Sequence, residues 1–571
     1  MRGGEPLTTF QQFEYVRPDI DQLKIKFKEL IAKLQSAASA GEQETVIHEI
    51  NQLRNSFDTQ NQLVSVRHSI DTTDEFYKAE QDFMDEVGPV VQEYISDYYR
   101  ALTTSRFRAE LESKWGTQLF ALAESAIRTF SPEIIEDLQL ENKLSTEYDQ
   151  LIASAKIPFE GEDRTLPQLL PFELSTDRDM RKKASEARFG FLTEKEPELD
   201  RIYDELVKVR TKMAKKLGYP SFVEMGYDRM MRTDYDAEMV ANFRKQVLDE
   251  IVPAATRLRE RQAARIDVDT LRYYDNGFSF KSGNAKPKGD PDWIVKHGED
   301  MYKELSPETD EFFQFMLKND LMDLVSKKGK AGGGYCTYIP DYKAPFIFSN
   351  FNGTSGDIDV LTHEAGHAFQ VYSSREHVVP EYLWPTYESA EIHSMSMEFF
   401  TWPWMEKFFE EDTDKYRFDH LASSLLFIPY GVSVDEFQHF VYANPDATPD
   451  ERKTAWRDIE KKYLPHLNYE GNDYLERGGF WQKQGHIYGA PFYYIDYTLA
   501  QLCAFQFWKR SREDFAAAWK DYIHLCGLGG TQSFTGLVRE AGLISPFEDG
   551  CVSSVIGSIE EWLDGVDDKA L

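Results

Sequence analysis

The residues of this chain best suited to chemistry lie within five positions, where His363 and His367 flank Glu364 in the pattern H-E-x-x-H. Side chains four residues apart lie on one face of an α-helix, so both imidazoles could bind the same zinc ion. The glutamate beside the first histidine would then stand next to a zinc-bound water, from which it could take a proton. The pattern therefore predicts a hydrolytic zinc site with Glu364 as the general base, although three fixed positions also arise by chance on solvated helices.

A catalytic zinc site needs a third protein ligand and one open position. In metzincins a histidine six residues after the second one supplies this ligand, but Ser373 stands there in this chain. The other known solution is a glutamate on the following helix. Residues 386–398 read as such a helix, because Pro385 would separate it from the first one, and Glu391 lies within it. We therefore predict Glu391 as the third ligand, with one Zn²⁺ per chain.

Two further carboxylates could orient a ligand histidine through its second ring nitrogen. Glu398 follows Glu391 by seven residues and shares its helix face, while Asp359 lies on the first helix. His393 is only two positions from Glu391 and points elsewhere, which favours a supporting or structural role. We predict that Glu398 or Asp359 supports the ligand shell.

The elements that must position these residues are two helices and a short pair of strands. Polar residues at 354–359 can cap a helix that runs through the proline-free stretch 360–372. Before it, residues 334–339 and 345–351 read as strands joined by the turn 340–344. Elsewhere apolar residues repeat at the spacing of a buried helix face. The sequence predicts a mostly α fold with a small β-sheet near the zinc helix.

The length of 571 residues exceeds what one hydrophobic core usually supports, so we expect two or more lobes. Residues 1–200 carry long polar helices and none of the chemical patterns. All of those patterns lie in residues 201–571. We therefore expect an N-terminal helical region over residues 1–200 and a catalytic region over residues 201–571.

The formal net charge of −33 arises from 98 acidic and 65 basic residues. So acidic a surface argues against nucleic acid or anionic lipid as a partner, since both bind basic patches. No apolar run approaches the roughly eighteen residues of a membrane span, and the first residues lack the apolar core of a signal peptide. The four cysteines have no paired spacing. We expect a cytoplasmic protein without a membrane partner.

Several segments, taken in order, resemble the thimet oligopeptidase and oligoendopeptidase F family of zinc peptidases, especially its Pz-peptidase-like bacterial members. The first of them are a strand at 344–351, a linker at 352–357 and the zinc-helix motif at 363–367. They are followed by the third-ligand segment 390–392, a His/Tyr segment at 486–497 and two C-terminal stretches, 527–530 and 541–546. The resemblance implies a two-lobed helical body around a deep central channel, with zinc on its floor and residues 1–200 in its wall. Only short oligopeptides would then reach the site.

Hydrolysis of a peptide bond also requires hydrogen-bond donors for the tetrahedral oxyanion, and tyrosine hydroxyls suit this role because they carry no competing charge. The resemblance implies His486 and Tyr497 as the main candidates, with Tyr494 next, for catalysis or substrate positioning. Tyr488 could contact substrate. The alternative for all of these tyrosines is an aromatic core, since the chain is 14% aromatic.

A peptidase must also bind the backbone of its peptide substrate. If residues 346–351 form an edge strand, they could pair with an extended peptide, which makes Phe346 and Phe348 candidate substrate-binding residues. Gly333, Gly334 and Tyr335 could form a mobile loop that lets a peptide approach closely. An ordinary flexible connection is the alternative for this loop.

Together these patterns predict a zinc-dependent endopeptidase that cleaves short oligopeptides. One alternative is a dipeptidyl carboxypeptidase or another exopeptidase on the same scaffold, which would need a cationic group for the terminal carboxylate. A second is a non-catalytic zinc-binding or peptide-binding protein, which would be expected to lack Glu364. The sequence leaves the oligomeric state and the cleavage preference open.

Overall fold

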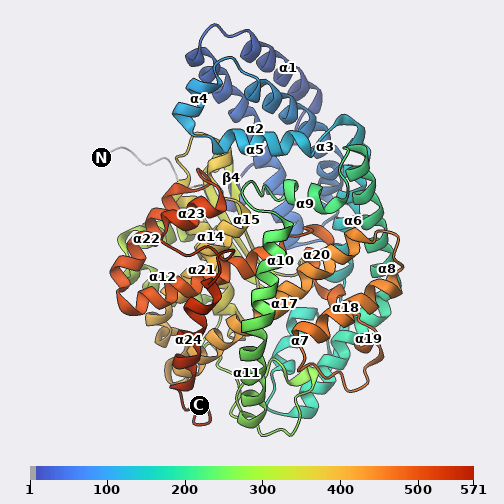
Figure 1. The fold of residues 1–571 in the computed structure, drawn as a ribbon, viewed down its shortest axis with the longest axis vertical. Coiled ribbons are helices and arrows are strands. Elements are labelled where there is room, and N and C mark those ends of the chain that lie inside the picture. The colour runs from blue at the N-terminus through green and yellow to red at the C-terminus, as the bar shows by residue number, and fades with distance from the viewer. Residues whose placement is uncertain (1–7) are drawn as a thin grey trace.

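The computed structural model describes residues 8–571 and is built almost entirely of helices (Figure 1). The helices are α1 Ile20–Ser36, α2 Ala40–Ile70, α3 Glu75–Thr103, α4 Arg108–Trp115, α5 Gln118–Arg128, α6 Ile135–Ala153, α7 Leu166–Glu173, α8 Arg178–Lys216, α9 Phe222–Arg229, α10 Ala237–Gln246, α11 Val252–Arg265, α12 Pro291–Leu305, α13 Pro307–Lys318, α14 Gly356–Ser374, α15 Tyr387–Phe400, α16 Glu406–Phe409, α17 Thr413–Ala443, α18 Pro449–Tyr463, α19 Asp473–Glu476, α20 Gly485–Gly489, α21 Tyr494–Glu513, α22 Phe515–Leu528, α23 Phe534–Glu540 and α24 Cys551–Asp564. The strands are β1 Ile157–Phe159, β2 Glu162–Arg164, β3 Met322–Val325, β4 Tyr335–Ile339 and β5 Ala344–Phe351. The predicted mostly α fold is confirmed.

The larger sheet has the order β3-β5-β4, with β5 parallel to β3 and antiparallel to β4. The two strands expected from the sequence are therefore present as β4 and β5. However, β5 is the central strand, so the expectation that residues 346–351 offer a free edge is wrong. Phe346 and Phe348 are buried, with 1% and 0% of their surface exposed, and the edge strands are β3 and β4.

The zinc helix expected from the sequence is α14, and it follows β5 directly. Its first turn is fixed by Asp357, whose carboxylate accepts hydrogen bonds from the backbone N–H groups of Asn352 and Gly353 at 2.9 and 2.8 Å. Helix α15 crosses α14 at Gly366, where a Cβ atom would lie 2.6 Å from the Cα of Ser394. Only glycine permits this close crossing, which brings the side chains of α15 against the histidines of α14.

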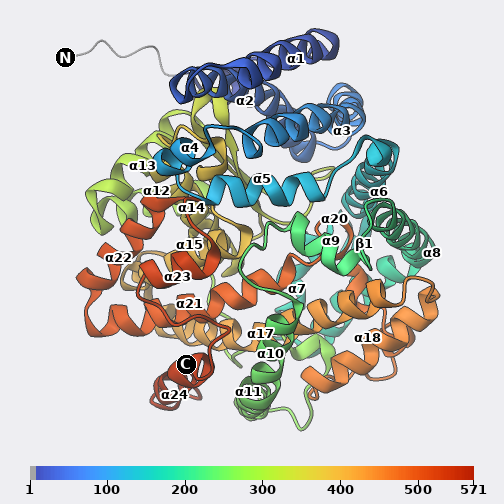
Figure 2. The ribbon, with the colours of Figure 1, turned by 45° about the horizontal axis from the view of Figure 1, so that its top comes forward.

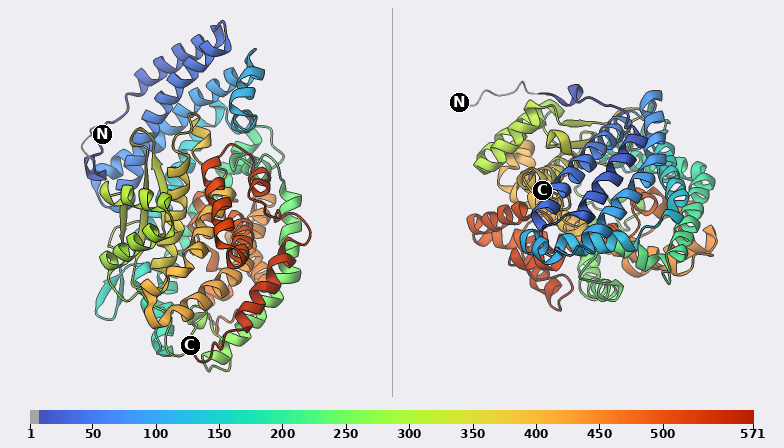
Figure 3. Two further views of the ribbon diagram at one scale, coloured as in Figure 1. Left: turned by 90° about the vertical axis from the view of Figure 1, so that its left-hand side faces the viewer. Right: turned by 90° about the horizontal axis from the view of Figure 1, so that it is seen from above.

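Helices α1, α2, α3 and α5 have a hydrophobic core of their own at one end of the molecule (Figure 2, Figure 3). They join the body through an ion pair of 2.6 Å between Arg54 and Glu381 and through the hydroxyl of Tyr382, which donates to the carbonyl of Trp115 at 2.7 Å. The division expected at residue 200 falls inside the continuous helix α8. Within residues 8–571, no helix is long and apolar enough to cross a membrane.

Candidate active site

The two histidines of α14 and the glutamate of α15 converge on one point. Glu391 Oε2 lies 3.1 Å from His363 Nε2 and 3.2 Å from His367 Nε2. One ligand atom from each of the three residues lies within 4.8 Å of the others. Two imidazole nitrogens and one carboxylate oxygen form a donor set that fits zinc with a position left open. The structure therefore brings together the three residues predicted as metal ligands.

Electrostatics keep Glu391 ready to act as an anionic ligand. Burial alone would raise the pKa of its carboxyl group, but the adjacent His367 and His363 hold this pKa well below its ordinary value. Ser394 also donates a hydrogen bond to Glu391 Oε2 at 2.8 Å. The carboxylate is thus held in place and in its charged form.

A chain of hydrogen bonds orients His363. The indole N–H of Trp402 can only donate, so its 3.0 Å contact makes His420 Nδ1 an acceptor. His420 Nε2 then donates to Glu398 at 2.7 Å, and the other Glu398 oxygen accepts from His363 Nδ1 at 2.7 Å. His363 Nε2 is left with its lone pair directed at the metal position, which is the arrangement that strengthens a metal ligand.

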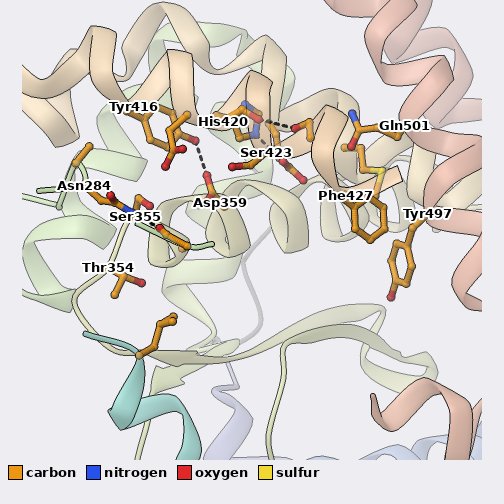
Figure 4. A pocket seen from close by; sticks show the side chains of 18 of the residues that line it. Asn284, Thr354, Ser355, Asp359, Tyr416, His420, Ser423, Phe427, Tyr497 and Gln501 are labelled. Atoms are coloured by element: carbon orange, nitrogen blue, oxygen red, sulfur yellow. Dashed lines mark hydrogen bonds and ion pairs between the residues drawn. The ribbon is translucent and has the colours of Figure 1, made fainter. Parts of the chain in front are cut away.

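Of the two carboxylates expected to support the ligands, only Glu398 contacts a ligand histidine. Asp359 instead accepts a hydrogen bond from the Tyr416 hydroxyl at 2.7 Å (Figure 4), so its predicted role beside a ligand is wrong. Helix positions in the sequence could not separate the two carboxylates, because the choice depends on where α17 lies. Sequence reasoning missed His420 for the same reason.

Glu364 is the carboxylate in this site that can still accept a hydrogen bond. Its Oε2 atom is buried and has no hydrogen-bond partner within residues 8–571, and burial raises the pKa of Glu364 above its ordinary value. A Cβ atom on Gly334 would lie 3.4 Å from Glu364 Oε1 and 3.0 Å from Val360. Gly334 therefore lets the β4 edge pass close to Glu364.

His486 and Tyr497 form a hydrogen-bonded pair that also lines the metal cavity. The amide of Gln484 donates to His486 Nδ1 at 2.8 Å, and His486 Nε2 lies 2.9 Å from the Tyr497 hydroxyl. Burial lowers the pKa of His486 to about 4, so the ring is neutral at pH 7 and donates through Nε2. The hydroxyl hydrogen of Tyr497 is not used in this contact.

The neighbouring tyrosines differ from the prediction. Tyr493, which was not predicted, donates a hydrogen bond to Glu391 and lines the same cavity as Tyr497. Tyr494 lines an adjoining cavity instead. Tyr488 is fully buried, stacks on Tyr148 at 4.0 Å and donates to the carbonyl of Leu199. Its predicted contact with substrate is therefore wrong. The signal for Tyr493 was its spacing of four residues from Tyr497, which places both on one side of a helix.

The metal position opens into a cavity of about 430 Å³. Residues from all parts of the site line it: Met231, Gly334, Tyr335, Cys336, Thr337, His363, Glu364, His367, Trp384, Pro385, Tyr387, Ala390, Glu391, His486, Tyr493 and Tyr497. Among the predicted substrate-binding residues, Gly334 and Tyr335 belong to this lining, whereas Gly333, Phe346 and Phe348 do not. A second cavity of about 560 Å³ adjoins it at His486 and Tyr497 (Figure 4).

The free edge of β4 faces this cavity at Cys336. Ile347 donates its backbone N–H to Leu321, away from β4, so its pairing partner Cys336 is not hydrogen-bonded to β5. The N–H and C=O groups of Cys336 therefore point outward. At Cys336, β4 thus directs its backbone groups away from the sheet, whereas β5 is paired on both sides.

A mostly helical body with this donor set at its centre has the architecture of a helical metallopeptidase. The profile of the Peptidase M3 N-terminal domain matches residues 10–130, and that of Peptidase family M3 matches residues 172–288 and 300–555. The chain therefore belongs to peptidase family M3 and is a metalloendopeptidase by family.

Solved structures and a curated relative agree with this assignment. The chain is 66% identical to Pz peptidase A, solved with an inhibitor, over 98% of this chain and 100% of that one, with a TM-score of 0.98. It is 64% identical to a candidate oligoendopeptidase F from Bacillus anthracis str. Ames over 99% of both chains, with a TM-score of 0.94. A further match, 26% identical over 227 residues, is an oligoendopeptidase F homolog of Borreliella burgdorferi. That alignment covers 38% of this chain and 37% of the relative, so the match spans well under half of the relative's length.

Proposed function

We propose that this chain is a zinc-dependent endopeptidase that hydrolyses internal bonds of short peptides. The observation that carries the proposal is the meeting of His363, His367 and Glu391 beside Glu364, whose Oε2 atom has no hydrogen-bond partner among residues 8–571. A bound Zn²⁺ would supply the charge that polarises a water molecule and the peptide carbonyl. The names of the similar proteins, Pz peptidase and oligoendopeptidase F, support peptides as the substrate class.

The side chains divide the reaction between them. Glu364 accepts a proton from the attacking water and later passes it to the leaving amine. Tyr497 donates its hydroxyl hydrogen to the carbonyl oxygen as negative charge develops there, and neutral His486 holds the hydroxyl in place. Tyr493 fixes Glu391 and so acts on the ligand shell instead.

The β4 edge holds the peptide backbone. Cys336 presents one N–H and one C=O group to the cavity, so an extended peptide can pair with it as an added strand. Gly334 keeps the neighbouring backbone close to Glu364. The scissile bond is thereby aligned between the base and the Tyr497 hydroxyl.

The N-terminal part of the chain contributes to the channel wall. Leu170 and Leu174 line the second cavity, and both lie within residues 1–200, the region expected to form part of the channel wall. The N-terminal family profile ends at residue 130, and the second profile begins at residue 172. Helices α1–α5 would then limit entry to peptides short enough to thread past them.

An exopeptidase needs a cation near the metal for the substrate terminus. None of the described residues lining the metal cavity is Lys or Arg, which favours internal cleavage. The test is zinc titration of the metal-free chain with a quenched fluorescent peptide that is acetylated at its N-terminus and amidated at its C-terminus. Internal cleavage that rises with zinc up to one equivalent supports the proposal. Cleavage of peptides with free ends alone, or none at all with zinc bound, would contradict it.

A further inference from the structure

Two non-glycine residues that share a buried arginine have left-handed backbone, and the first of them lines the metal cavity. Met231 has φ of +57° and Phe492 has φ of +67°. This region of backbone conformation is unfavourable for non-glycine residues, and such strain persists only where the surrounding structure holds it. Met231 lies in the connection between α9 and α10, and Phe492 precedes α21, so distant parts of the chain bring the two strained residues together.

One buried arginine fastens both positions. Arg232 follows Met231 and has 0% of its side chain exposed. It donates hydrogen bonds to the carbonyl of Phe492 at 2.6 Å and to the carboxylate of Asp496 at 2.9 Å. The backbone is held as well, because Met231 N–H donates to Asp228 at 3.0 Å and Arg232 N–H donates to Tyr227 at 3.2 Å. The Met231 segment is therefore fixed against the start of α21.

This fixation places the Met231 side chain in the wall of the metal cavity. The lining of this cavity also includes Trp384, Pro385 and Tyr387, a residue that is 41% exposed. The charged residues of the cavity are the ligand set and Glu364, and they lie on α14 and α15. The Met231 wall is thus an apolar surface beside the reacting groups, and apolar side chains are what such a surface binds.

We propose that Met231 is a specificity-determining residue, which forms one wall of a subsite for an apolar side chain next to the scissile bond. The left-handed backbone, locked by Arg232, sets the depth of this subsite. The inference rests on the proposed peptidase function and adds to it a preferred substrate class, peptides with a large apolar residue at one position flanking the cleaved bond.

The test compares wild type with Met231→Asn and Met231→Leu. Asn is one of the non-glycine residues that accept left-handed backbone, so it keeps the chain path while removing the apolar wall. Leu conserves the apolar volume. Two series of blocked peptides vary Leu against Ala, one on each side of the cleaved bond, and kcat/KM is measured for every pair.

We expect Met231→Asn to lower the Leu-to-Ala ratio of kcat/KM by about tenfold or more in one series and to leave the other series within about threefold, since a methylene in an apolar pocket changes discrimination by about 10–200-fold. Met231→Leu should keep both ratios. Met231→Gly, which relieves the strain, gives the same measurement if the Asn variant does not fold. Unchanged ratios on both sides of the bond would overturn the inference while leaving the peptidase function standing. A wild-type chain that cleaves no peptide of either series would contradict both the Met231 subsite and the proposed peptidase function.

Discussion

The two cavities that meet at His486 and Tyr497 differ in how far their carboxyl and imidazole groups are paired. In the metal cavity, Glu364 Oε2 and His367 Nδ1 are buried without hydrogen-bond partners in the described chain. In the second cavity, Asp359 is bonded to Tyr416, and His420 is bonded to Glu398 and Trp402 (Figure 4). Buried polar groups are normally paired, so unused capacity marks the place where a ligand or reactant is expected. We therefore expect the reaction in the first cavity and a supporting role for the second.

Removing a ligand from the metal cavity should have the largest effect. Glu391→Ala deletes one of three donors, and we expect zinc to bind about a thousandfold more weakly, because a zinc-binding free energy of about 10–16 kcal/mol is shared among few ligands. Competition with a fluorescent chelator measures this affinity. Glu388→Ala lies on the same helix outside the ligand set and serves as a control for helix damage. Retention of wild-type affinity by Glu391→Ala would show that the third ligand lies elsewhere.

The second largest effect should come from a change at Tyr497, which lines both cavities. Tyr497→Phe removes a single hydroxyl, and we expect kcat to fall about a hundredfold with little change in zinc affinity, because one oxyanion donor contributes on the order of 10²–10³ in kcat. Tyr494→Phe is the matched control from the second cavity and should stay near wild type. Steady-state kinetics on one blocked peptide measures both. Equal losses in the two variants would remove the distinction between the cavities.

A change in the supporting chain should have a smaller effect. His420→Leu leaves Glu398 without its second donor, so His363 is held less firmly, and we expect zinc affinity to fall about 10–100-fold. His420→Gln can still donate to Glu398 and should recover much of that affinity. Chelator competition distinguishes the two. No difference between Leu and Gln would mean that His420 only fills space.

The smallest expected effect is on stability against pH. His486 has a pKa of about 4 in the folded chain, against an ordinary value of 6.5, because it is buried. Between pH 4 and 6.5 the unfolded chain binds the proton more tightly, so His486 contributes a stability that increases as pH rises through this window. The melting temperature of His486→Gln, measured against pH, should rise less steeply there than that of wild type. Parallel curves would show that His486 is not buried in neutral form.

The parts of this site that follow a local rule could be predicted from the sequence. The spacing of His363 and His367 places them on one helix face, and α14 and α15 have the expected order and extent. The two strands were also predicted close to their observed bounds. In each case the information lies within a few residues along the chain.

The parts of the site that depend on long-range packing could not be predicted from the sequence. Strand β3 is short and pairs directly with β5, which makes β5 central and leaves β3 and β4 at the edges of the sheet. His420 reaches Glu398 from α17, and Tyr493 reaches Glu391 from the start of α21. No spacing rule connects these residues, because their proximity is set by how the helices pack.

The central claim is that His363, His367 and Glu391 hold one zinc ion while Glu364 acts on the water. The most direct measurement determines zinc content and kcat together in Glu364→Gln, an isosteric change that keeps the metal ligands. We expect about one zinc per chain and a kcat that falls by about 10²–10⁴-fold, the usual range for a general base. A zinc-loaded variant with an unchanged kcat would contradict the account.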